Sequence, residues 1–358
     1  MSMSFSVHSH IHDYDVFIQP TPDFIAELVH QPQACFIVDK NVWDLYSSTL
    51  LKDLPAENVI ILPINEDRKN LDTVQELFDR LVALSAKRNL TMISFGGGIL
   101  QDITGFAAST IYRGIRWIYI PTTLLAQADS CIGSKTSLNY RGYKNLIGTF
   151  YPPTEIHLYT PFLKTQQDSD FYSGFGEVIK LHLMGGKTHY QEIMRNIPRI
   201  LTREPDALLQ AIQTSLAVKL SYIDRDEFDV GRRNLLNYGH DFGHALESTS
   251  NFAVPHGQAV IFGMLAANLI AKNRGLLDET LATEIVRSLI LPSLKVLPAP
   301  DAIQPEAIIT AMKKDKKRTG DLLALIMMRD GFDFIRVNDL TPAEVTVALA
   351  ESKEILAL

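Results

Sequence analysis

The amino-acid sequence predicts an α/β protein in which an N-terminal domain with a parallel sheet precedes a mostly α-helical C-terminal domain. In the first 160 residues, short β-branched runs alternate with stretches of helical spacing, which is typical of a parallel sheet. After residue 161 the pattern changes to long helical stretches. With 358 residues, of which 46% are hydrophobic, the chain is long enough for two domains with buried cores. We expect these domains to span residues 1–160 and 161–358.

Four apolar runs are predicted to be buried strands of the sheet. They are CFIVD (35–39), NVIILPI (58–64), TMISF (91–95) and WIYIP (117–121). Residues 71–88, between the second and third runs, carry apolar side chains at helical spacing. A helix there would supply the crossover that two parallel strands need.

The domain boundary is expected at YPPTEIHLYTP, residues 151–161, which contains two adjacent prolines, a short strand and a further proline. Beyond it, helical spacing extends over residues 203–224, 256–273 and 340–356. The second domain should therefore be mostly helical.

Composition and charge exclude several classes of protein. The net charge of −7 at pH 7 gives no reason to expect nucleic acid or an anionic membrane as partner. Two cysteines in so long a chain fit a reducing compartment without a disulfide framework. The start of the sequence lacks the apolar region of a signal peptide, and no apolar run approaches the roughly 18 residues that a membrane span needs. We expect a cytoplasmic protein.

The stretch SFGGGILQDITGFAAS, residues 94–109, places three glycines directly after a predicted strand and before a predicted helix. Glycines there allow backbone N–H groups to approach a phosphate, and the helix N-terminus adds a positive partial charge. This pattern favours a diphosphate site. A tight strand-to-helix turn without a ligand is the alternative, and the spacing is not that of the G-x-G-x-x-G fingerprint.

A second signal is the run of cations in DSCIGSKTSLNYRGYKNLIG, residues 129–148. Lys135, Arg141, Lys144 and Asn145 lie there among small residues. In an acidic protein this arrangement favours an anion pocket built on loops. A solvated loop is the alternative.

Two further segments carry candidate metal ligands. In GFGEVIKLH (174–182), Glu177 and Lys180 are three residues apart and share one helical face, where a surface ion pair is the simplest account. In NLLNYGHDFGHALE (234–247), His240 and His244 are four apart in a predicted helix, and His256 follows. A carboxylate with two imidazoles is the ligand set of a catalytic zinc site. Spacing alone does not decide which two histidines bind, and buried, hydrogen-bonded histidines are the alternative.

Taken together, these segments resemble 3-dehydroquinate synthase and the other sugar phosphate cyclases. The resemblance runs in matching order and spacing from about residue 35 to about residue 330. It is carried by GGG…D…GFAA, RG…PTTLLAQ.DS…G.KT..N…KN.IG.FY.P, SG…EVIK and LLN.GH.FGHA.E…HG.AV. It implies a Rossmann-like NAD-binding domain, a helical metal-binding domain and a homodimer.

The resemblance also implies the ligands and the site residues. The metal, zinc or cobalt, would be bound by Glu177, His240 and His256, and His244 would lie near the substrate and relay a proton with its phosphate. The implied NAD-binding residues are Asp39, Asn41, Glu66, Lys69, Gly97, Gly98, Asp102, Thr122, Thr123 and Thr165. The implied catalytic residues are Lys135, Lys180, Lys219, Arg233, Asn237, His244 and Asp129. The implied substrate-binding residues are Arg113, Lys144, Asn145 and Lys316, of which Arg113 would reach across the dimer interface.

The implied activity is the cyclisation of a C7 keto-acid sugar phosphate (DAHP) to 3-dehydroquinate with elimination of phosphate, a step of the shikimate pathway to aromatic amino acids. Lys219, Arg233 and Asn237 favour this branch, because the resemblance associates them with the substrate carboxylate. We expect Arg233 and Asn237, seven and three residues before His240, to share its helical face. The alternatives are a valiolone- or inosose-synthase-like cyclase acting on sedoheptulose 7-phosphate, and a glycerol-dehydrogenase-like alcohol dehydrogenase.

Four residues depart from the usual pattern of this family. Gln101 and Ser134 stand where glycine is common, Asp241 replaces a common threonine, and Gln258 replaces the glutamate of HGEAV. None of them removes a ligand or a pocket cation. Asp241 and Gln258 are expected to change the groups around the metal ligands, which tune ligand orientation.

Overall fold

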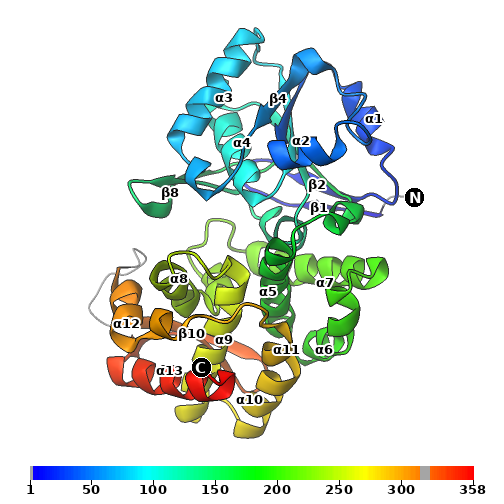
Figure 1. The fold of residues 1–358 in the computed structure, drawn as a ribbon. Helices are drawn as coiled ribbons and strands as arrows, with labels where there is room; N and C mark the ends of the chain where they lie inside the picture. The colour runs from blue at the N-terminus through cyan, green and yellow to red at the C-terminus, as the bar shows by residue number, and fades with distance from the viewer. Residues whose placement is uncertain (1–2, 315–322) are drawn as a thin grey trace. The chain divides into compact units, whose positions relative to one another are not determined.

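A seven-stranded sheet forms the centre of the first of two structural units (Figure 1). The computed structural model describes residues 3–314 and 323–358. Unit 1 comprises Met1–Gln166 and Ile223–Phe228, and unit 2 comprises Gln167–Tyr222 and Asp229–Leu358. The boundary expected after residue 160 lies close to the division after Gln166, whereas the return of residues 223–228 to unit 1 has no counterpart in the sequence analysis.

The strands of this sheet follow the order β1-β2-β9-β6-β5-β3-β4. They are β1 (Met3–Val7), β2 (Tyr14–Ile18), β3 (Ala34–Asp39), β4 (Val59–Leu62), β5 (Thr91–Gly96), β6 (Arg116–Pro121) and β9 (Glu155–Leu158). All neighbouring pairs are parallel except β1 and β2, which form an antiparallel hairpin. The four predicted strands are therefore confirmed as β3 to β6.

Helices cover both faces of the sheet (Figure 1). On one face, α1 (Phe24–Val29) and α2 (Lys40–Tyr46) pack against alternate strand residues such as Phe36 and Ile93. On the other, α4 (Gly98–Thr110) approaches the sheet closely, since a Cβ on Gly105 would lie 3.1 Å from the Trp117 ring. Next to α4 lies α3 (Leu71–Ala83), which ends five residues before its predicted end.

Residues 135–150 form an antiparallel hairpin of β7 (Lys135–Tyr140) and β8 (Tyr143–Phe150), so the prediction of loops is wrong here. The strand β7 alternates buried Thr136 and Leu138 with more exposed residues, which is the period of a half-buried strand. Arg141 and Gly142 both have positive φ, 49° and 78°, as a two-residue hairpin turn of the I′ type requires.

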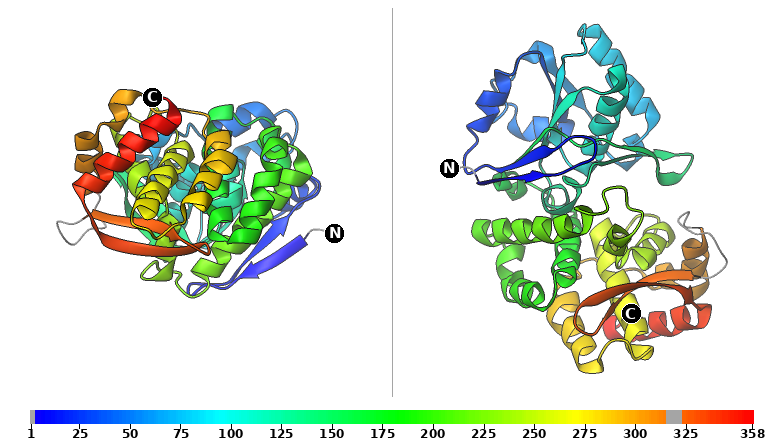
Figure 2. Two further views of the ribbon diagram at one scale, coloured as in Figure 1. Left: turned by 90° about the horizontal axis from the view of Figure 1, so that it is seen from below. Right: turned by 180° about the vertical axis from the view of Figure 1, so that it is seen from behind.

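Unit 2 is mostly helical, as predicted, around the central helix α9 (His256–Asn273) (Figure 2). Every residue of α9 from Gly257 to Ala271 is buried. Its other helices are α5 (Asp168–Met184), α6 (Lys187–Leu201), α7 (Pro205–Ile223), α8 (His240–Thr249), α10 (Glu279–Ile285), α11 (Leu291–Ser293), α12 (Pro305–Lys313) and α13 (Pro342–Leu356). A hairpin of β10 (Leu323–Arg329) and β11 (Asp333–Leu340) packs beside α9. None of the helices in the described part of the chain is both long and apolar enough to span a bilayer.

Candidate metal and dinucleotide sites

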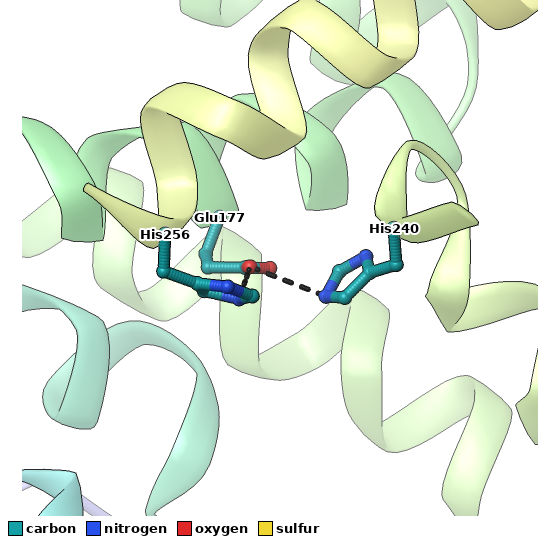
Figure 3. A group of neighbouring side chains, drawn as sticks. All are labelled: Glu177, His240 and His256. Carbon is teal, nitrogen blue, oxygen red and sulfur yellow. Dashed lines mark ion pairs between the residues drawn. The ribbon is translucent and has the colours of Figure 1, made fainter. Parts of the chain in front are cut away.

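Glu177, His240 and His256 bring their ligand atoms together in unit 2 (Figure 3). The Glu177 Oε1 lies 3.1 Å from His256 Nε2 and 3.5 Å from His240 Nε2. Three protein ligands, one carboxylate and two imidazoles, leave a coordination position open for a substrate oxygen. These three residues could therefore hold a divalent metal ion.

Close helix packing places two of these ligands. Gly176 precedes Glu177 on α5, and Gly257 follows His256 on α9. A Cβ on Gly176 would lie 2.1 Å from the Gly257 carbonyl oxygen, and a Cβ on Gly257 would lie 1.7 Å from the Ser173 carbonyl oxygen. The two helices can approach only because these positions lack side chains, and this approach brings the carboxylate to the imidazole.

The third candidate ligand, His240, begins helix α8 directly after Gly239, whose φ of 79° is in the left-handed region. Arg233 and Asn237 belong to a separate 3₁₀ turn that spans Arg232–Asn237. The prediction that they share the helical face of His240 is therefore wrong, because Gly239 interrupts the helix. Gly239 in turn packs against α9, where a Cβ on Gly263 would lie 1.9 Å from its carbonyl oxygen.

The Glu177 carboxylate has the properties of a metal ligand. It is 1% exposed, and neither of its oxygens has a hydrogen-bond partner of good geometry among the described residues. Burial alone would raise the pKa of Glu177, but Lys180, whose Nζ lies 2.5 Å from Oε2, and His256 hold the pKa well below its usual value. The predicted pair of Glu177 and Lys180 is thus present, but it is buried rather than on the surface. An ionised carboxylate beside two imidazoles fits a divalent cation.

The two imidazoles differ in charge. Burial, together with the nearby Lys180, lowers the pKa of His240 well below its usual value, so this ring is neutral. Its Nδ1 lies 3.2 Å from the Tyr238 carbonyl oxygen, which leaves the Nε2 lone pair directed at Glu177. A neutral imidazole with a free lone pair is the form that binds a metal.

His256 lies between two carboxylates. Its Nδ1 is 3.0 Å from the buried Glu247 Oε2, and its Nε2 faces Glu177. Burial opposes the charge, but both carboxylates together raise the pKa of His256 to about 10. A metal bound at Nε2 would replace the proton that faces Glu177, while Glu247 would still accept the Nδ1 proton. Glu247 was missed in the sequence, although it lies seven residues after His240 on one face of α8.

His244 does not join the Glu177 group. It is exposed, and its ring centroid lies 5.2 Å from that of His240. The described residues contain a second group of possible ligands, His244, Glu247 and His256, which shares only His256 with the first. Neither group contains both His240 and His244, so the i,i+4 pair is not the pair that geometry favours.

In unit 1, the order of the strands reverses between β3 and β5, because the chain continues from β3 to β4 on one side and returns to β5 on the other. Ligands of such sheets bind at the carboxyl ends of the strands beside this reversal. Asp39 ends β3, the glycine turn follows β5, and Thr122 follows β6, where its N–H donates to the Gly96 carbonyl at 3.0 Å. Of the predicted dinucleotide residues, Asp39, Gly97, Gly98 and Thr122 therefore lie at the carboxyl ends of these strands.

The glycines of the turn lie in tight surroundings. Gly97 caps helix α4, which begins at Gly98, and neither residue has a positive φ. A Cβ on Gly97 would lie 3.0 Å from Thr123 Cγ2, and one on Gly98 would lie 3.3 Å from Ser130 Oγ. The first N–H groups of a helix have no partner within it, so they can receive a phosphate here.

A polar network connects residues assigned to the cofactor with one assigned to the substrate. The Lys69 Nζ lies 2.5 Å from Asp102 Oδ2 and donates to Asn145 Oδ1 at 2.6 Å. The Ser137 hydroxyl lies 3.1 Å from Asp102 Oδ2 and 2.9 Å from Asn145 Oδ1, and it can donate its one proton to either oxygen. Burial raises the pKa of Asp102 even though Lys69 opposes this shift.

The other predicted residues of unit 1 lie around these positions. Asp39 accepts a hydrogen bond from the Asn41 N–H, Glu66 accepts one from Asn139, and Thr165 Oγ1 is 2.7 Å from the Tyr46 hydroxyl. The Lys144 Nζ lies 3.9 Å from Glu66 Oε1. Asp129 is in a π-helical turn, Lys135 begins β7, and Arg113 is exposed with a φ of 63°.

In unit 2, the predicted cations Lys180, Lys219 and Arg233 are all buried. Asn237 donates to the Asn234 carbonyl at 2.9 Å. Lys316 lies outside the described residues.

The unusual residues of unit 1 form specific links. The Gln101 amide donates to the Ser130 carbonyl at 2.7 Å and accepts from the Ser130 hydroxyl at 2.7 Å. The Ser134 hydroxyl donates to Glu227. These links lie next to the glycine turn and next to Lys135.

The unusual residues of unit 2 bond to backbone. Asp241 accepts from the Ile326 N–H at 3.2 Å, which ties α8 to β10. The fully buried Gln258 donates to two carbonyls, of Tyr172 and Ser293, and accepts from two N–H groups, of Lys295 and Val296. Gln258 thus fixes the first turn of α9, which begins at His256.

Comparisons with known proteins show the family of the chain. The model of the 3-dehydroquinate synthase N-terminal family matches residues 59–173, and that of the C-terminal family matches residues 174–318. The 3-dehydroquinate synthase of Dehalococcoides mccartyi (strain ATCC BAA-2266 / KCTC 15142 / 195) is 32% identical over 337 residues, 93% of each chain. That of Acidithiobacillus ferrooxidans (strain ATCC 53993 / BNL-5-31) is 37% identical over 322 residues, 87% of each chain.

Solved structures of sugar phosphate cyclases share the fold. A 2-epi-5-epi-valiolone synthase from Streptomyces hygroscopicus subsp. jinggangensis, with NAD⁺ and Zn²⁺ bound, is 26% identical with a TM-score of 0.83, covering 98% of this chain and 99% of that one. A 2-deoxy-scyllo-inosose synthase complexed with carbaglucose-6-phosphate, NAD⁺ and Co²⁺ has a TM-score of 0.81 at 23% identity, covering 98% of this chain and 100% of that one. Both family models and the full-length relatives lead to one conclusion: the chain belongs to the 3-dehydroquinate synthase family.

Proposed function

We propose that this enzyme of the phosphate-eliminating cyclisation family converts DAHP to 3-dehydroquinate, with NAD and a divalent metal as cofactors. The observation that carries the proposal is the similarity to 3-dehydroquinate synthases over 93% of the chain, together with the presence of Lys219 and Arg233 in the same unit as the metal ligand group. A guanidinium binds a carboxylate bidentately, so a substrate with a carboxylate suits these residues.

The residues present fit the two cofactors. Glu177, His240 and His256 would hold Zn²⁺ or Co²⁺, and Lys180 keeps the Glu177 carboxylate ionised. The glycine turn at Gly97 and Gly98 would hold the NAD diphosphate. When bound, the metal would supply a Lewis acid that polarises a substrate hydroxyl, and NAD would supply a hydride acceptor that is regenerated within the same turnover.

The chain's own groups then hold the substrate anions and move a proton. Lys135, Lys144 and Asn145 would bind the phosphate or other anionic groups in unit 1. The exposed imidazole of His244 can exchange a proton with the phosphate as it leaves. Arg113 has an exposed side chain. It would bind an anion in the site of the partner subunit of a cytoplasmic homodimer.

A cyclase that acts on sedoheptulose 7-phosphate is the second candidate. It is supported by the TM-score of 0.83 to the 2-epi-5-epi-valiolone synthase. The glycerol dehydrogenase alternative has weaker support, because the iron-containing alcohol dehydrogenase is 16% identical with a TM-score of 0.63 and shares only the fold.

The test measures phosphate release by the purified enzyme, loaded with NAD and Zn²⁺, from DAHP and from sedoheptulose 7-phosphate. We expect a higher kcat/KM for DAHP than for sedoheptulose 7-phosphate. The absorbance of NADH should show no net formation of NADH during turnover. Arg233→Ala should lower kcat/KM for DAHP by at least about tenfold, which corresponds to the lower end of the free energy that a charge-assisted hydrogen bond contributes. Faster turnover of sedoheptulose 7-phosphate would assign the enzyme to the other branch, and net NADH would indicate a dehydrogenase.

A further inference from the structure

The carboxylate of Glu227 gathers hydrogen-bond donors from two distant parts of unit 1. Its Oε1 accepts from the Ser9 and Ser134 hydroxyls, each at 2.6 Å. Its Oε2 accepts from the His10 backbone N–H at 2.7 Å and lies 3.0 Å from His10 Nδ1. Glu227 is 6% exposed, and although burial alone would raise its pKa, these hydrogen bonds lower it. The side chain is therefore an ionised junction that fixes every group bonded to it.

Ser134 connects this junction to the anion-binding residues. Its φ of 65° is in the left-handed region, which is unfavourable for a residue with a Cβ. Glu227 holds its side chain, and its carbonyl accepts from the Tyr151 N–H at 2.6 Å. The next residue, Lys135, is the first of β7. The direction in which Lys135 leaves the turn thus depends on how Ser134 is held.

Phe228 contacts the strand that pairs with Lys135. Its ring centroid lies 5.1 Å from that of Phe150, which is the cross-strand partner of Lys135 in the hairpin. The same ring lies 5.4 Å from that of His10. Glu227 and Phe228 belong to the segment 223–228, which joins unit 1 although the residues before and after it belong to unit 2. Two adjacent residues of one inserted segment therefore fix both strands at the start of the hairpin.

We propose that Glu227 is a positioning residue that sets the Lys135 ammonium in place for an anionic group of the substrate. It acts through the hydrogen bond to Ser134, with the contact of Phe228 to Phe150 as the second fixed point. This inference rests on the proposed function for its substrate, in which Lys135 binds an anion. Glu227 itself is not assigned to substrate contact.

Three variants of the full-length, NAD- and Zn²⁺-loaded enzyme test the proposal. Glu227→Gln keeps the size of the side chain but replaces one acceptor oxygen by a donor. Ser134→Ala removes only the bond next to Lys135. Ser9→Ala is the control, because it removes a bond of the same length, 2.6 Å, to the same oxygen from a residue that is not next to Lys135 in the chain. It also removes the acceptor of the Ile11 N–H.

We expect KM for DAHP to rise about tenfold in Glu227→Gln and about threefold in Ser134→Ala, in line with the loss of a charge-assisted hydrogen bond. The Ser9→Ala variant should keep the wild-type KM, while its melting temperature falls at least as far as that of Ser134→Ala. An equal rise in KM in both serine variants would reduce Glu227 to a general structural role and overturn the proposal.

Two further measurements need no turnover. Backbone amide exchange at residues 133–136, and the rate at which an amine-specific reagent labels Lys135, should both increase in Glu227→Gln and Ser134→Ala but not in Ser9→Ala. Unchanged exchange and labelling in the two folded variants would overturn the proposal. If the wild-type enzyme released no phosphate from DAHP, the proposed function would fail, whereas exchange and labelling would still decide the role of Glu227.

Discussion

The Glu247 Oε2 lies 3.0 Å from His256 Nδ1, on the opposite side of the imidazole ring from Glu177. A carboxylate in this position fixes the ring orientation and raises the basicity of the ligating nitrogen. Glu247→Ala should therefore weaken zinc binding by about 10- to 100-fold, measured by competition with a chelator. Glu247→Gln, which keeps a neutral acceptor, should lose less. Wild-type affinity in Glu247→Ala would show that this carboxylate does not support the ligand.

The two possible ligand groups make opposite predictions for their histidines. If Glu177, His240 and His256 bind the metal, His240→Ala should lose it, as determined by metal analysis after dialysis. His244→Ala should keep its metal and lose turnover by about 100-fold or more, the range of a proton-transfer residue. The reverse pattern, with metal retained in His240→Ala, would assign the ion to the group of His244, Glu247 and His256.

A branched side chain at Gly98 should block the cofactor. Its Cβ would approach Ser130 Oγ to 3.3 Å, and its methyl groups would cover the first N–H groups of α4. We expect Gly98→Val to weaken NAD binding by at least about tenfold in calorimetry, through loss of these charge-assisted contacts. Gly105→Ala is the control on the same helix, since its Cβ would meet Thr136 at 2.7 Å. It should lower the melting temperature and leave NAD affinity unchanged; equal losses of NAD affinity would contradict the site.

Gln258 is expected to be required as an amide. Each of its two terminal groups satisfies two backbone partners, and a glutamate would turn an oxygen toward the carbonyls of Tyr172 and Ser293. Gln258→Glu should destabilise unit 2 by about 2–4 kcal/mol, the cost of a buried, unsatisfied charged group. Thermal unfolding measures this loss, and a variant as stable as the wild type would show that the loop at 293–296 rearranges without cost.

The stability of unit 2 should depend on acid through Glu344. This residue closes a capping box with Thr341 and pairs with Arg274, contacts that lower its pKa from 4.5 to about 2. A lowered pKa in the folded state means that the stabilisation is complete above about pH 4.5 and is lost as the pH falls toward about 2. Glu344→Gln should cost about 1–2 kcal/mol at neutral pH. Denaturant unfolding should show this difference shrinking in acid; a constant difference would exclude the linkage.

The elements with a strong apolar pattern were predicted well from the sequence. Strands β3 to β6 follow from short apolar runs and helix α9 follows from helical spacing, and the bounds of α9 match those predicted. The hairpin β7–β8 was not predicted, because its alternation is short and its two glycines and three cations also suit a loop. Residues 232–237 were predicted to continue the helix of His240. The spacing of side chains cannot show that Gly239, in the left-handed conformation, separates the two segments.

The candidate metal site shows a similar limit. The residue types were identified from sequence, but spacing could not select His256 over His244 as the partner of His240. That selection depends on the approach of α5 to α9, which is permitted by Gly176 and Gly257. Glu247 could not be predicted for the same reason, because its partner His256 is on another helix.

The return of residues 223–228 to unit 1 has a consequence for recombination within this family. A chimaera joined after residue 166 takes Ser9, His10 and Ser134 from one parent and position 227 from the other. Their hydrogen bonds would then depend on two separately inherited halves. A chimaera that takes residues 223–228 and the N-terminal half from the same parent keeps all of these hydrogen-bond partners from one protein. We therefore expect functional hybrids to have three junctions: one after residue 166, one before residue 223 and one after residue 228.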